Sequence, residues 1–374
     1  MTTQLSSHQT DAGTASAPPV PEADPAAVAA FAERCVGFMN QGAIALLISV
    51  GHQAGLFELM VRHPGSTSQQ LADTGHLDER YVREWLAGMV TAGIVRYHPD
   101  TRTHVLPPEH AAVLTESAGP DNMAHLMQYI GVMGRVEQPI VERFHHGGGL
   151  SYADYPDFHR IMAQESAAVN DASLIDGILP LVEGLPERLE AGIDVADIGC
   201  GSGHAINLMA AAYPGSRFTG YDFSADAIAT ARREAAEWGL DNARFEVLDV
   251  AALDVAEGFD AITAFDAIHD QAHPARVLGN IHRALRPGGV FLMVDIRAES
   301  QVEDNLSLPW ASYLYAISMF HCMSVSLGLG GDGLGTVWGR QVAERMVSEA
   351  GFTTVEAKDI ATDPFNTYYV ASKD

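Results

Sequence analysis

The chain has 374 residues, of which 47% are hydrophobic, so it has the length of about two domains and enough apolar material for real cores. Its formal net charge of −26 speaks against partners that are bound through basic surfaces, such as nucleic acids and anionic lipids. The three cysteines, Cys35, Cys200 and Cys322, are scattered and predict neither a disulfide framework nor a zinc cluster. We therefore expect a cytoplasmic protein that binds small molecules.

Residues 1–25 are polar and rich in Ser, Thr, Ala and Pro, without the basic start or apolar core of a signal peptide, so they predict a disordered tail. Residues 26–54 are then predicted to form one or two helices, and no Asp, Glu, Lys or Arg occurs between Arg34 and Glu58. The apolar core of that stretch, residues 43–50, is shorter than the about 20 residues of a membrane span. We expect a helix buried in protein, for which a subunit interface is one setting.

Two helices and a hairpin are predicted next. Ser66 is expected to cap a helix that Gly75 ends, and Asp78 to cap a second helix. The second helix carries apolar residues at helical spacing, namely Tyr81, Val82, Trp85, Leu86, Met89 and Val90. Two short strands flank the turn at residues 99–102. Together these elements predict a winged helix in a domain that spans residues 26–150.

A winged helix can bind DNA, but this one lacks the charge for it. Residues 26–150 hold 8 arginines, no lysine and 12 acidic residues. Because nonspecific DNA affinity comes from Lys and Arg that neutralise phosphates, we expect a structural domain and no nucleic-acid partner.

A connector helix at residues 123–144 ends in His145 and His146. No third ligand with suitable spacing lies near, so we predict a solvated helix end and no metal site.

The segment 194–203, DVADIGCGSG, organises the second half of the chain. A short apolar strand leads into a loop with Gly199, Gly201 and Gly203, where a ligand can approach bare backbone. The spacing G-x-G-x-G differs from the G-x-G-x-x-G of dinucleotide sites, and no Lys-Ser/Thr follows as in a P-loop. Asp197 would repel a pyrophosphate and attract the ammonium group of a methionine moiety.

The next strands end in acidic residues. Asp222 can accept hydrogen bonds from two ribose hydroxyls, and Asp249 from an adenine amino group while Val250 packs on the ring. These strands are predicted at residues 217–222, 243–249, 259–266 and 290–296, with the tight turn LRPGG before the last.

The motifs DIGCGSG, YD, LD, FD and LRPGG occur in the order and spacing of the class I S-adenosylmethionine (SAM) dependent methyltransferases, which the chain resembles from Tyr152 to its C-terminus. The resemblance implies an α/β fold, a Rossmann-like seven-stranded methyltransferase sheet in a domain of residues 151–374. It also implies SAM as cofactor and S-adenosylhomocysteine as product. Small-molecule O-methyltransferases of plants and bacteria carry a similar N-terminal winged helix, which forms their dimer and walls the substrate pocket. A homodimer is therefore expected here.

The resemblance also implies the cofactor contacts. Asp222 would bind the ribose, and Phe223 and Val250 would enclose the adenine. Met162 belongs to an F-x-x-x-M-x-x-x-S pattern that borders the methionine end of SAM, although an amphipathic core helix explains it as well. The predicted contacts are Asp197, Gly199, Gly201, Gly203, Asp222, Phe223, Asp249, Val250, Phe265, Asp270 and Met162.

The run His269-Asp270-Gln271 resembles the His-Asp-Trp motif of this group, in which the His is the general base and the Asp contacts the cofactor. A hydroxyl acceptor must lose a proton, and a neutral His suits that task. Gln271 stands where that motif has its Trp, so this position differs from the motif. The alternative is that His269 only lines the pocket while proximity does the work. His273 is the second choice of base, or a helix cap.

No charged residue occurs from residue 305 to residue 331, a stretch rich in aromatic residues and Met. The family places its substrate-binding insertion there, which favours a small, partly apolar acceptor; a dimer interface is the alternative. His321 is either a second active-site histidine or a core residue.

We predict methyl transfer, with oxygen preferred over nitrogen or carbon as the acceptor atom. The rival functions are a SAM-binding transcriptional regulator that uses the winged helix and a nicotinamide-dependent oxidoreductase.

Overall fold

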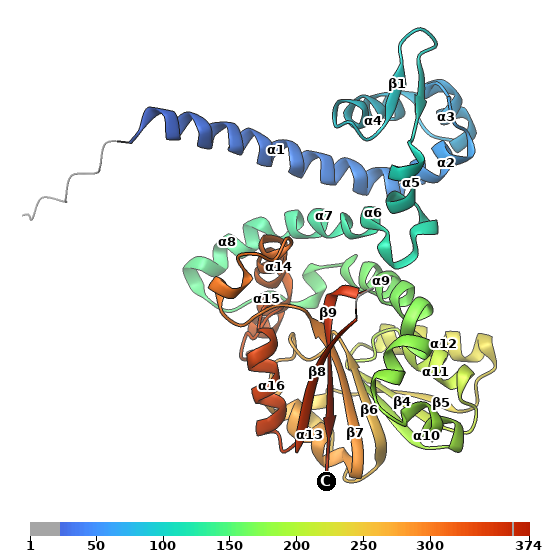
Figure 1. Ribbon diagram of the computed structural model, residues 1–374, viewed down its shortest axis with the longest axis vertical. Coiled ribbons are helices and arrows are strands. Elements are labelled where there is room, and N and C mark those ends of the chain that lie inside the picture. The colour runs from blue at the N-terminus through green and yellow to red at the C-terminus, as the bar shows by residue number, and fades with distance from the viewer. Residues whose placement is uncertain (1–22, 361–362) are drawn as a thin grey trace, which may run out of the picture. The chain divides into compact units, whose positions relative to one another are not determined.

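Figure 1 shows the computed structural model, which describes residues 23–360 and 363–374. The chain forms two compact units, residues 1–44 and residues 45–374. The expected disordered tail lies almost wholly outside the described residues. The expected domain boundary at residues 150 and 151 falls within the second unit and stays a prediction.

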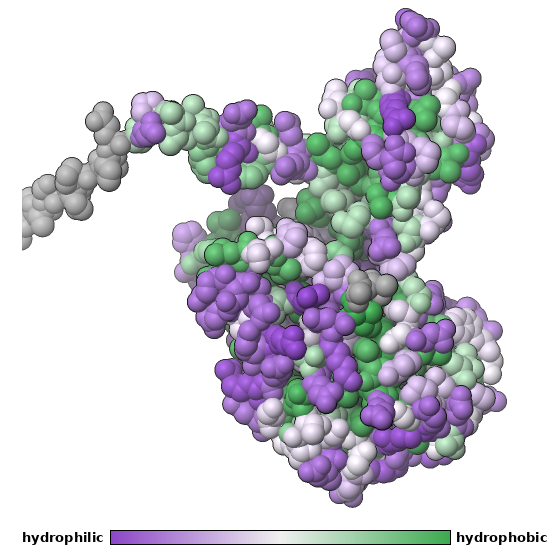
Figure 2. Space-filling view, in the orientation of Figure 1, coloured by the Kyte–Doolittle hydropathy of each residue, from purple (hydrophilic) through white to green (hydrophobic). Residues whose placement is uncertain are grey.

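Helix α1, Pro25–Gln53, is mostly exposed within the single chain. Among the described residues it is the one helix long and apolar enough to cross a membrane by length and composition, and 17% of its most apolar stretch is buried. Figure 2 shows apolar surface, in green, along this helix. Its large exposed apolar residues are Val28, Phe31, Val36, Phe38, Met39, Leu46 and Val50. The buried residues of α1 are Ile48, Ser49 and Gly51, and burial of this helix in protein, for example at a subunit interface, stays a prediction.

The predicted winged helix is present. It consists of α2 (Leu56–Arg62), α3 (Ser68–Gly75), α4 (Glu79–Thr91), the antiparallel pair β1 (Arg96–His98) and β2 (Thr103–Val105), and α5 (Pro108–Leu114). Asp78 caps α4 as predicted, accepting from the backbone N–H groups of Arg80 and Tyr81. The predicted cap of α3 is wrong: Thr67, and not Ser66, caps it, because Thr67 and Gln70 form a reciprocal capping box.

Helix α4 packs through Val82, Trp85, Leu86 and Met89, all buried as expected. Tyr81 is instead 81% exposed, since the apolar stripe is narrower than the sequence pattern suggested. The Trp85 Nε1–H donates to the Leu47 carbonyl at 2.8 Å, which ties α4 to the end of α1.

The predicted single connector is three short helices, α6 (Met123–Leu126), α7 (Gln128–Arg135) and α8 (Glu137–His146). Pro139 explains the last break, because proline is tolerated in a first helical turn but not in a helix interior. After a 3₁₀ turn at Tyr152–Asp154, helix α9 covers Phe158–Ser173 and carries Met162.

The sheet has the predicted seven strands. They are β3 (Asp194–Ile198), β4 (Arg217–Asp222), β5 (Ala243–Val247), β6 (Phe259–Phe265), β7 (Leu285–Ile296), β8 (Thr354–Ile360) and β9 (Asp363–Ser372). Their order is β5-β4-β3-β6-β7-β9-β8, and β9 is antiparallel to both neighbours. The LRPGG turn is a bulge within β7: Phe259 pairs with Leu285 but Ala261 pairs with Val290.

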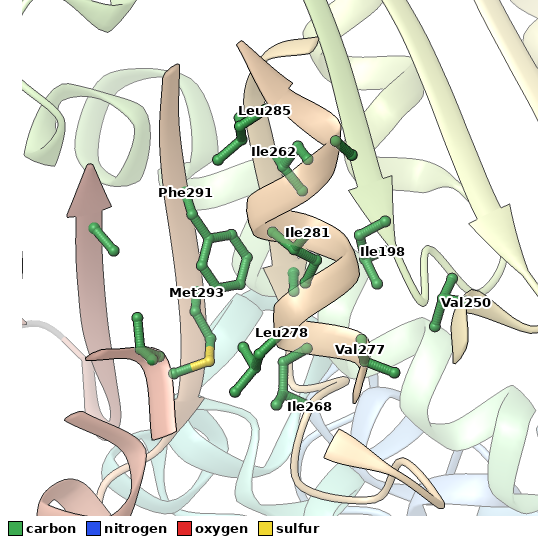
Figure 3. Close-up of a cluster of buried hydrophobic side chains, with 14 of the residues drawn as sticks. Ile198, Val250, Ile262, Ile268, Val277, Leu278, Ile281, Leu285, Phe291 and Met293 are labelled. Carbon is green, nitrogen blue, oxygen red and sulfur yellow. The ribbon is translucent and has the colours of Figure 1, made fainter. Parts of the chain in front are cut away.

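Helices cover both faces of this sheet (Figure 1). On one face lie α10 (Leu185–Ala191), α11 (His204–Ala212) and α12 (Ala225–Trp238), and on the other α13 (Pro274–Ala284) and α16 (Gly339–Glu349). Consecutive residues of one strand pack against helices on opposite faces of the sheet, because side chains alternate across a strand. Ala261 packs with α11, whereas Ile262 packs with Leu278 and Ile281 of α13, as Figure 3 shows.

The uncharged insertion forms α14 (Ala311–Ile317) and α15 (Met323–Gly328), joined by a π-helical turn at Ser318–Cys322. It packs on α9 and the residues before it: the Tyr155 hydroxyl donates to the Phe320 carbonyl, and His321 stacks on Phe158. This packing brings the insertion over the carboxyl ends of the strands.

Candidate active site

The glycine loop lies between β3 and α11. Gly199, Gly201 and Gly203 have φ values of 71°, 53° and 74°, a region that favours glycine. A Cβ on Gly203 would lie 2.5 Å from the Ala231 Cβ, so this glycine is required for packing. A Cβ on Gly201 would meet no atom within 4 Å. Gly201 therefore leaves bare backbone beside open space, as a nucleotide-like cofactor requires.

Asp222 ends β4 beside this loop and is 9% exposed. Its Oδ2 accepts from the Gly201 N–H at 2.9 Å and its Oδ1 from the Ser224 N–H at 2.8 Å. Burial raises the pKa of Asp222, and these two bonds oppose the rise. Each oxygen retains a lone pair, so the carboxylate can still accept from a ribose diol.

Asp197 lies inside β3 and is buried. Its Oδ1 accepts from the Thr263 hydroxyl at 2.7 Å. Burial raises the pKa of Asp197 to about 7, although the Thr263 bond opposes the shift. An ammonium group beside Asp197 would restore its charged form.

The two side chains assigned to the adenine differ in exposure. Phe223 is 46% exposed and its ring centroid lies 5.1 Å from that of Tyr152, so its face is available to a ligand. Val250 is 4% exposed and packs in the α13 core. Asp249 caps the 3₁₀ turn Val250–Ala252 through the Ala251 N–H at 2.9 Å.

A cavity of about 150 Å³ lies over the ends of β6, β7 and β9. Helix α9 and the insertion enclose it, and a dry cavity of this size holds a benzene-sized group in other proteins. Among the predicted site residues it is lined by Met162, Phe265, His269 and Asp270. Its apolar wall includes Leu126, Phe158, Val294, Ile296, Leu314, Ile317 and Phe365.

His269 is buried at this cavity and paired with an acid. Its Nδ1 lies 2.9 Å from the Oδ1 of Asp295, at the end of β7, and the Trp338 indole N–H donates to the same oxygen at 3.0 Å. Burial lowers the pKa of His269, but the Asp295 charge, Cys322 and their hydrogen bonds outweigh it and raise that pKa well above its ordinary value. The Asp295 bond directs Nε2 to act as the proton acceptor of the neutral ring.

The other residues of the motif have different environments. Asp270 accepts from the Tyr152 hydroxyl at 3.1 Å, and burial raises its pKa to about 6. Gln271 donates to the Ala267 carbonyl at 2.7 Å. His273 does not line the cavity; its side chain is 48% exposed and lies 4.0 Å from Asp332.

Comparisons with known proteins find matches in both halves of the chain. Residues 42–116 match the model of the Rv2258c-like winged HTH domain, and residues 189–326 match that of a methyltransferase domain. The chain carries a SAM-dependent methyltransferase domain behind a winged-helix domain. The fold and the cofactor class predicted from the sequence are confirmed.

Two curated relatives each match about a third of the chain or less. Trans-aconitate 2-methyltransferase of Methylobacterium nodulans is 34% identical over 121 residues, which is 32% of this chain and 42% of that protein. Demethylmenaquinone methyltransferase of Thermus thermophilus is 32% identical over 102 residues, 27% of this chain and 46% of that protein. The chain thus spans less than half the length of these two relatives.

Solved structures share the fold over most of the chain. The mitomycin 7-O-methyltransferase MmcR has a TM-score of 0.69 at 18% identity and covers 93% of this chain and 99% of its own. Human N-acetylserotonin methyltransferase in complex with SAM has a TM-score of 0.67 at 16% identity, covering 95% and 99%. At this level of identity the likeness establishes the fold.

The sequence did not single out three residues at or behind this cavity: Glu165 and Tyr129 line it, and Asp295 sits behind His269. Asp266, the acid of the FD motif, lines it as well. One signal was present: Asp266 and Asp295 both stand at carboxyl ends of neighbouring strands, where sites of open α/β sheets gather. Glu165 and Tyr129 gave no such signal, because only the packing of α7 and α9 brings them there.

Proposed function

We propose that this protein transfers the methyl group of SAM to a hydroxyl oxygen of a small, partly apolar molecule. The observation that carries the proposal is the His269–Asp295 pair. It faces the same cavity as Met162, Phe265 and Asp270, which we assign to the cofactor.

SAM supplies an electrophilic methyl group when it is bound. The glycine loop and Asp222 would hold its nucleoside part, with Phe223 and Val250 beside the adenine and Asp249 at its amino group. Asp197 would attract its ammonium group. The fit rests on the open backbone at Gly201 and on the free lone pairs of Asp222.

The chain's own task at the acceptor is to orient a hydroxyl and take its proton. Asp295 fixes the ring of His269 through Nδ1, so Nε2 can accept the hydroxyl proton, and the resulting imidazolium is stabilised by the buried carboxylate. Orientation inside a closed cavity contributes a large part of the rate, because a displacement needs the oxygen in line with the methyl group. The apolar wall selects a partly apolar acceptor.

The exposed apolar face of α1 supports a homodimer in which a second copy covers it. Phe31 and Phe38 are 58% and 53% exposed, and such a large apolar face is unusual on a monomer. Burial of this face against a second copy would also explain the apolar composition of α1, with no need for its insertion into a membrane. The free cysteines support a cytoplasmic location.

The winged helix is proposed to be structural. In α4, Arg80 pairs with Glu84, and the Arg83 guanidinium lies 3.6 Å from Glu79. These arginines are already neutralised by neighbouring acids, so the helix offers no basic face to DNA.

The test is calorimetric titration of the purified protein with SAM and with S-adenosylhomocysteine, repeated on Asp222→Ala. We expect micromolar binding to the wild type and a loss of about 1 to 3 kcal/mol in the variant, the worth of bonds to a charged group. Tritiated methyl transfer to a panel of phenols and alcohols then follows. Failure of the wild type to bind either nucleoside would disprove the proposal.

A further inference from the structure

One end of the cavity is acidic. Glu165 of α9 and Asp266, directly after β6, line it, and the charge of Asp363 acts on both. Among the lining residues in the described part of the chain, no Lys or Arg occurs. The side chains around this end are aromatic, namely Tyr129, Tyr313, Phe365 and Tyr368.

Neither carboxyl group has a Lys or Arg beside it among the described residues that line the cavity. Glu165 accepts from the Tyr129 hydroxyl at 2.5 Å, and burial raises its pKa although this bond opposes the rise. The Oδ1 of Asp266 is buried without a hydrogen-bond partner. Burial, followed by the charge of Asp295, raises the pKa of Asp266 well above its ordinary value, with His269 opposing. A buried carboxyl of this kind costs folding free energy unless a ligand satisfies it.

These carboxyls differ from those assigned to the cofactor. Asp222 is bonded to the glycine loop, and the charges acting on Asp270 include His269 and Asp222. Asp295 and His269 act on Asp266 as they do on Asp270, whereas Glu165 and Asp363 act on Asp266 alone of the two. Tyr313 of α14, in the insertion, lines the cavity, and the charge of Glu165 acts on it, so the acidic end borders the insertion, where the acceptor would bind.

A second, independent group points to a ligand at the same cavity. His321 is 1% exposed, and neither of its ring nitrogens has a hydrogen-bond partner. Its ring stacks on Phe158 with a centroid distance of 3.3 Å. Burial lowers the pKa of His321 well below its ordinary value, so the ring is neutral and offers one acceptor and one donor.

We infer that the acceptor carries a protonated amine besides the hydroxyl that is methylated, that Glu165 and Asp266 bind this amine, and that His321, unpartnered at the same cavity, forms a hydrogen bond with the acceptor. The inference rests on the proposed function and names the substrate class. An ammonium group has three N–H donors, and two carboxyl groups can accept from all of them. The aromatic side chains add cation–π attraction. A carboxylate group on the acceptor would instead be repelled by the negative charges of Glu165 and Asp266.

The test uses three phenols of one shape that differ at the end of the side chain: tyramine, 4-ethylphenol and 3-(4-hydroxyphenyl)propionate. Each is titrated calorimetrically into the complex of the protein with S-adenosylhomocysteine, and each is offered as acceptor with tritiated SAM. We expect tyramine to bind at least about tenfold more tightly than 4-ethylphenol, and the propionate to bind most weakly.

The variant Glu165→Gln keeps the acceptor for Tyr129 and removes the charge. It should weaken tyramine binding at least about tenfold and leave the affinities for 4-ethylphenol, SAM and S-adenosylhomocysteine unchanged. Glu237→Gln, at an exposed position of α12, is the matched control and should change none of them.

Each contrary outcome has a distinct meaning. Absence of S-adenosylhomocysteine binding would reject the proposed function itself. If that ligand binds, equal affinities for the three phenols, or no tyramine binding up to about 10 mM, would overturn the amine inference alone. A selective loss of SAM affinity in Glu165→Gln would assign the carboxylate to the sulfonium and would overturn it as well.

Discussion

The Nδ1 atom of His269 lies 2.9 Å from the Oδ1 atom of Asp295, and both side chains are buried at the carboxyl ends of neighbouring strands. The Trp338 indole donates to the same carboxylate oxygen. In the proposed mechanism Asp295 is a positioning residue that would fix the ring and tautomer of His269, as buried acids do for catalytic histidines elsewhere.

Replacement of the histidine tests its role as base. We expect His269→Ala to lower kcat by about 10²- to 10⁴-fold, the usual contribution of a general base, with little change in S-adenosylhomocysteine affinity. Single-turnover transfer of tritiated methyl measures this. His273→Ala should retain activity, because His273 is outside the cavity. Full activity in His269→Ala would show instead that proximity alone does the work.

The pH dependence of methyl transfer follows from the raised pKa of His269. Only the neutral ring accepts a proton, so the rate of the wild type should rise with pH through a pKa above 6.5. Asp295→Asn removes the charge that raises this pKa, so the ascending limb should move to lower pH while the limiting rate falls. A pH–rate profile of both proteins measures this, and an unmoved limb in Asp295→Asn would contradict it.

Two glycines of one loop should respond differently to alanine. In Gly203→Ala the new Cβ meets Ala231, so we expect a loss of about 1 to 3 kcal/mol in the free energy of unfolding. In Gly201→Ala the new Cβ meets no protein atom and projects into space assigned to the cofactor. Its stability loss should be smaller, about 1 to 2 kcal/mol from backbone strain, but SAM affinity should fall about tenfold.

Chemical denaturation and calorimetric titration of both variants separate the two effects. Tight cofactor binding by Gly201→Ala would place the cofactor elsewhere.

Asp197 predicts proton release on cofactor binding. Its pKa of about 7 leaves it partly protonated at pH 6.5, and a bound ammonium group would lower that pKa and expel the proton. Calorimetric titration of S-adenosylhomocysteine in buffers of different ionisation enthalpy measures the released protons. Asp197→Asn should abolish the release; equal release in the variant would assign the proton to another group.

The apolar face of α1 predicts how the protein associates. Phe38→Asp should shift the protein from dimer to monomer, as measured by light scattering after size-exclusion chromatography. Asn40→Asp adds the same charge two residues away, about 200° around the helix, and should leave the dimer intact. A monomeric wild type would reject the proposed homodimer.

Local signals in the sequence were sufficient for the scaffold. The glycine loop after Asp197 and the acidic ends of the next strands carried the resemblance that implied the seven-stranded sheet, because such motifs are short and local in the chain. The Asp78 cap was correct for the same reason. The cap of α3 was wrong because Ser66 and Thr67 are equivalent in sequence, and only the bond between Thr67 and Gln70 distinguishes them.

Exposure was harder to predict than secondary structure. The spacing of Tyr81 fits an apolar stripe, but only the neighbours of α4 determine how wide the buried stripe is. Likewise the uncharged composition of α1 indicated burial, whereas the buried residues of this helix are Ile48, Ser49 and Gly51 at its C-terminal end.

The sequence by itself determined the fold class, and it singled out the glycine loop and His269 for roles that stay predictions, because each signal depends on residues close together in the chain. The tertiary structure decided which distant groups meet at His269. Asp295 reaches His269 from the next strand, Glu165 and His321 enter the cavity from separate helices, and His273 is left outside. Contacts between such distant residues depend on how the helices and strands pack. The spacing of residues along the chain therefore does not predict them.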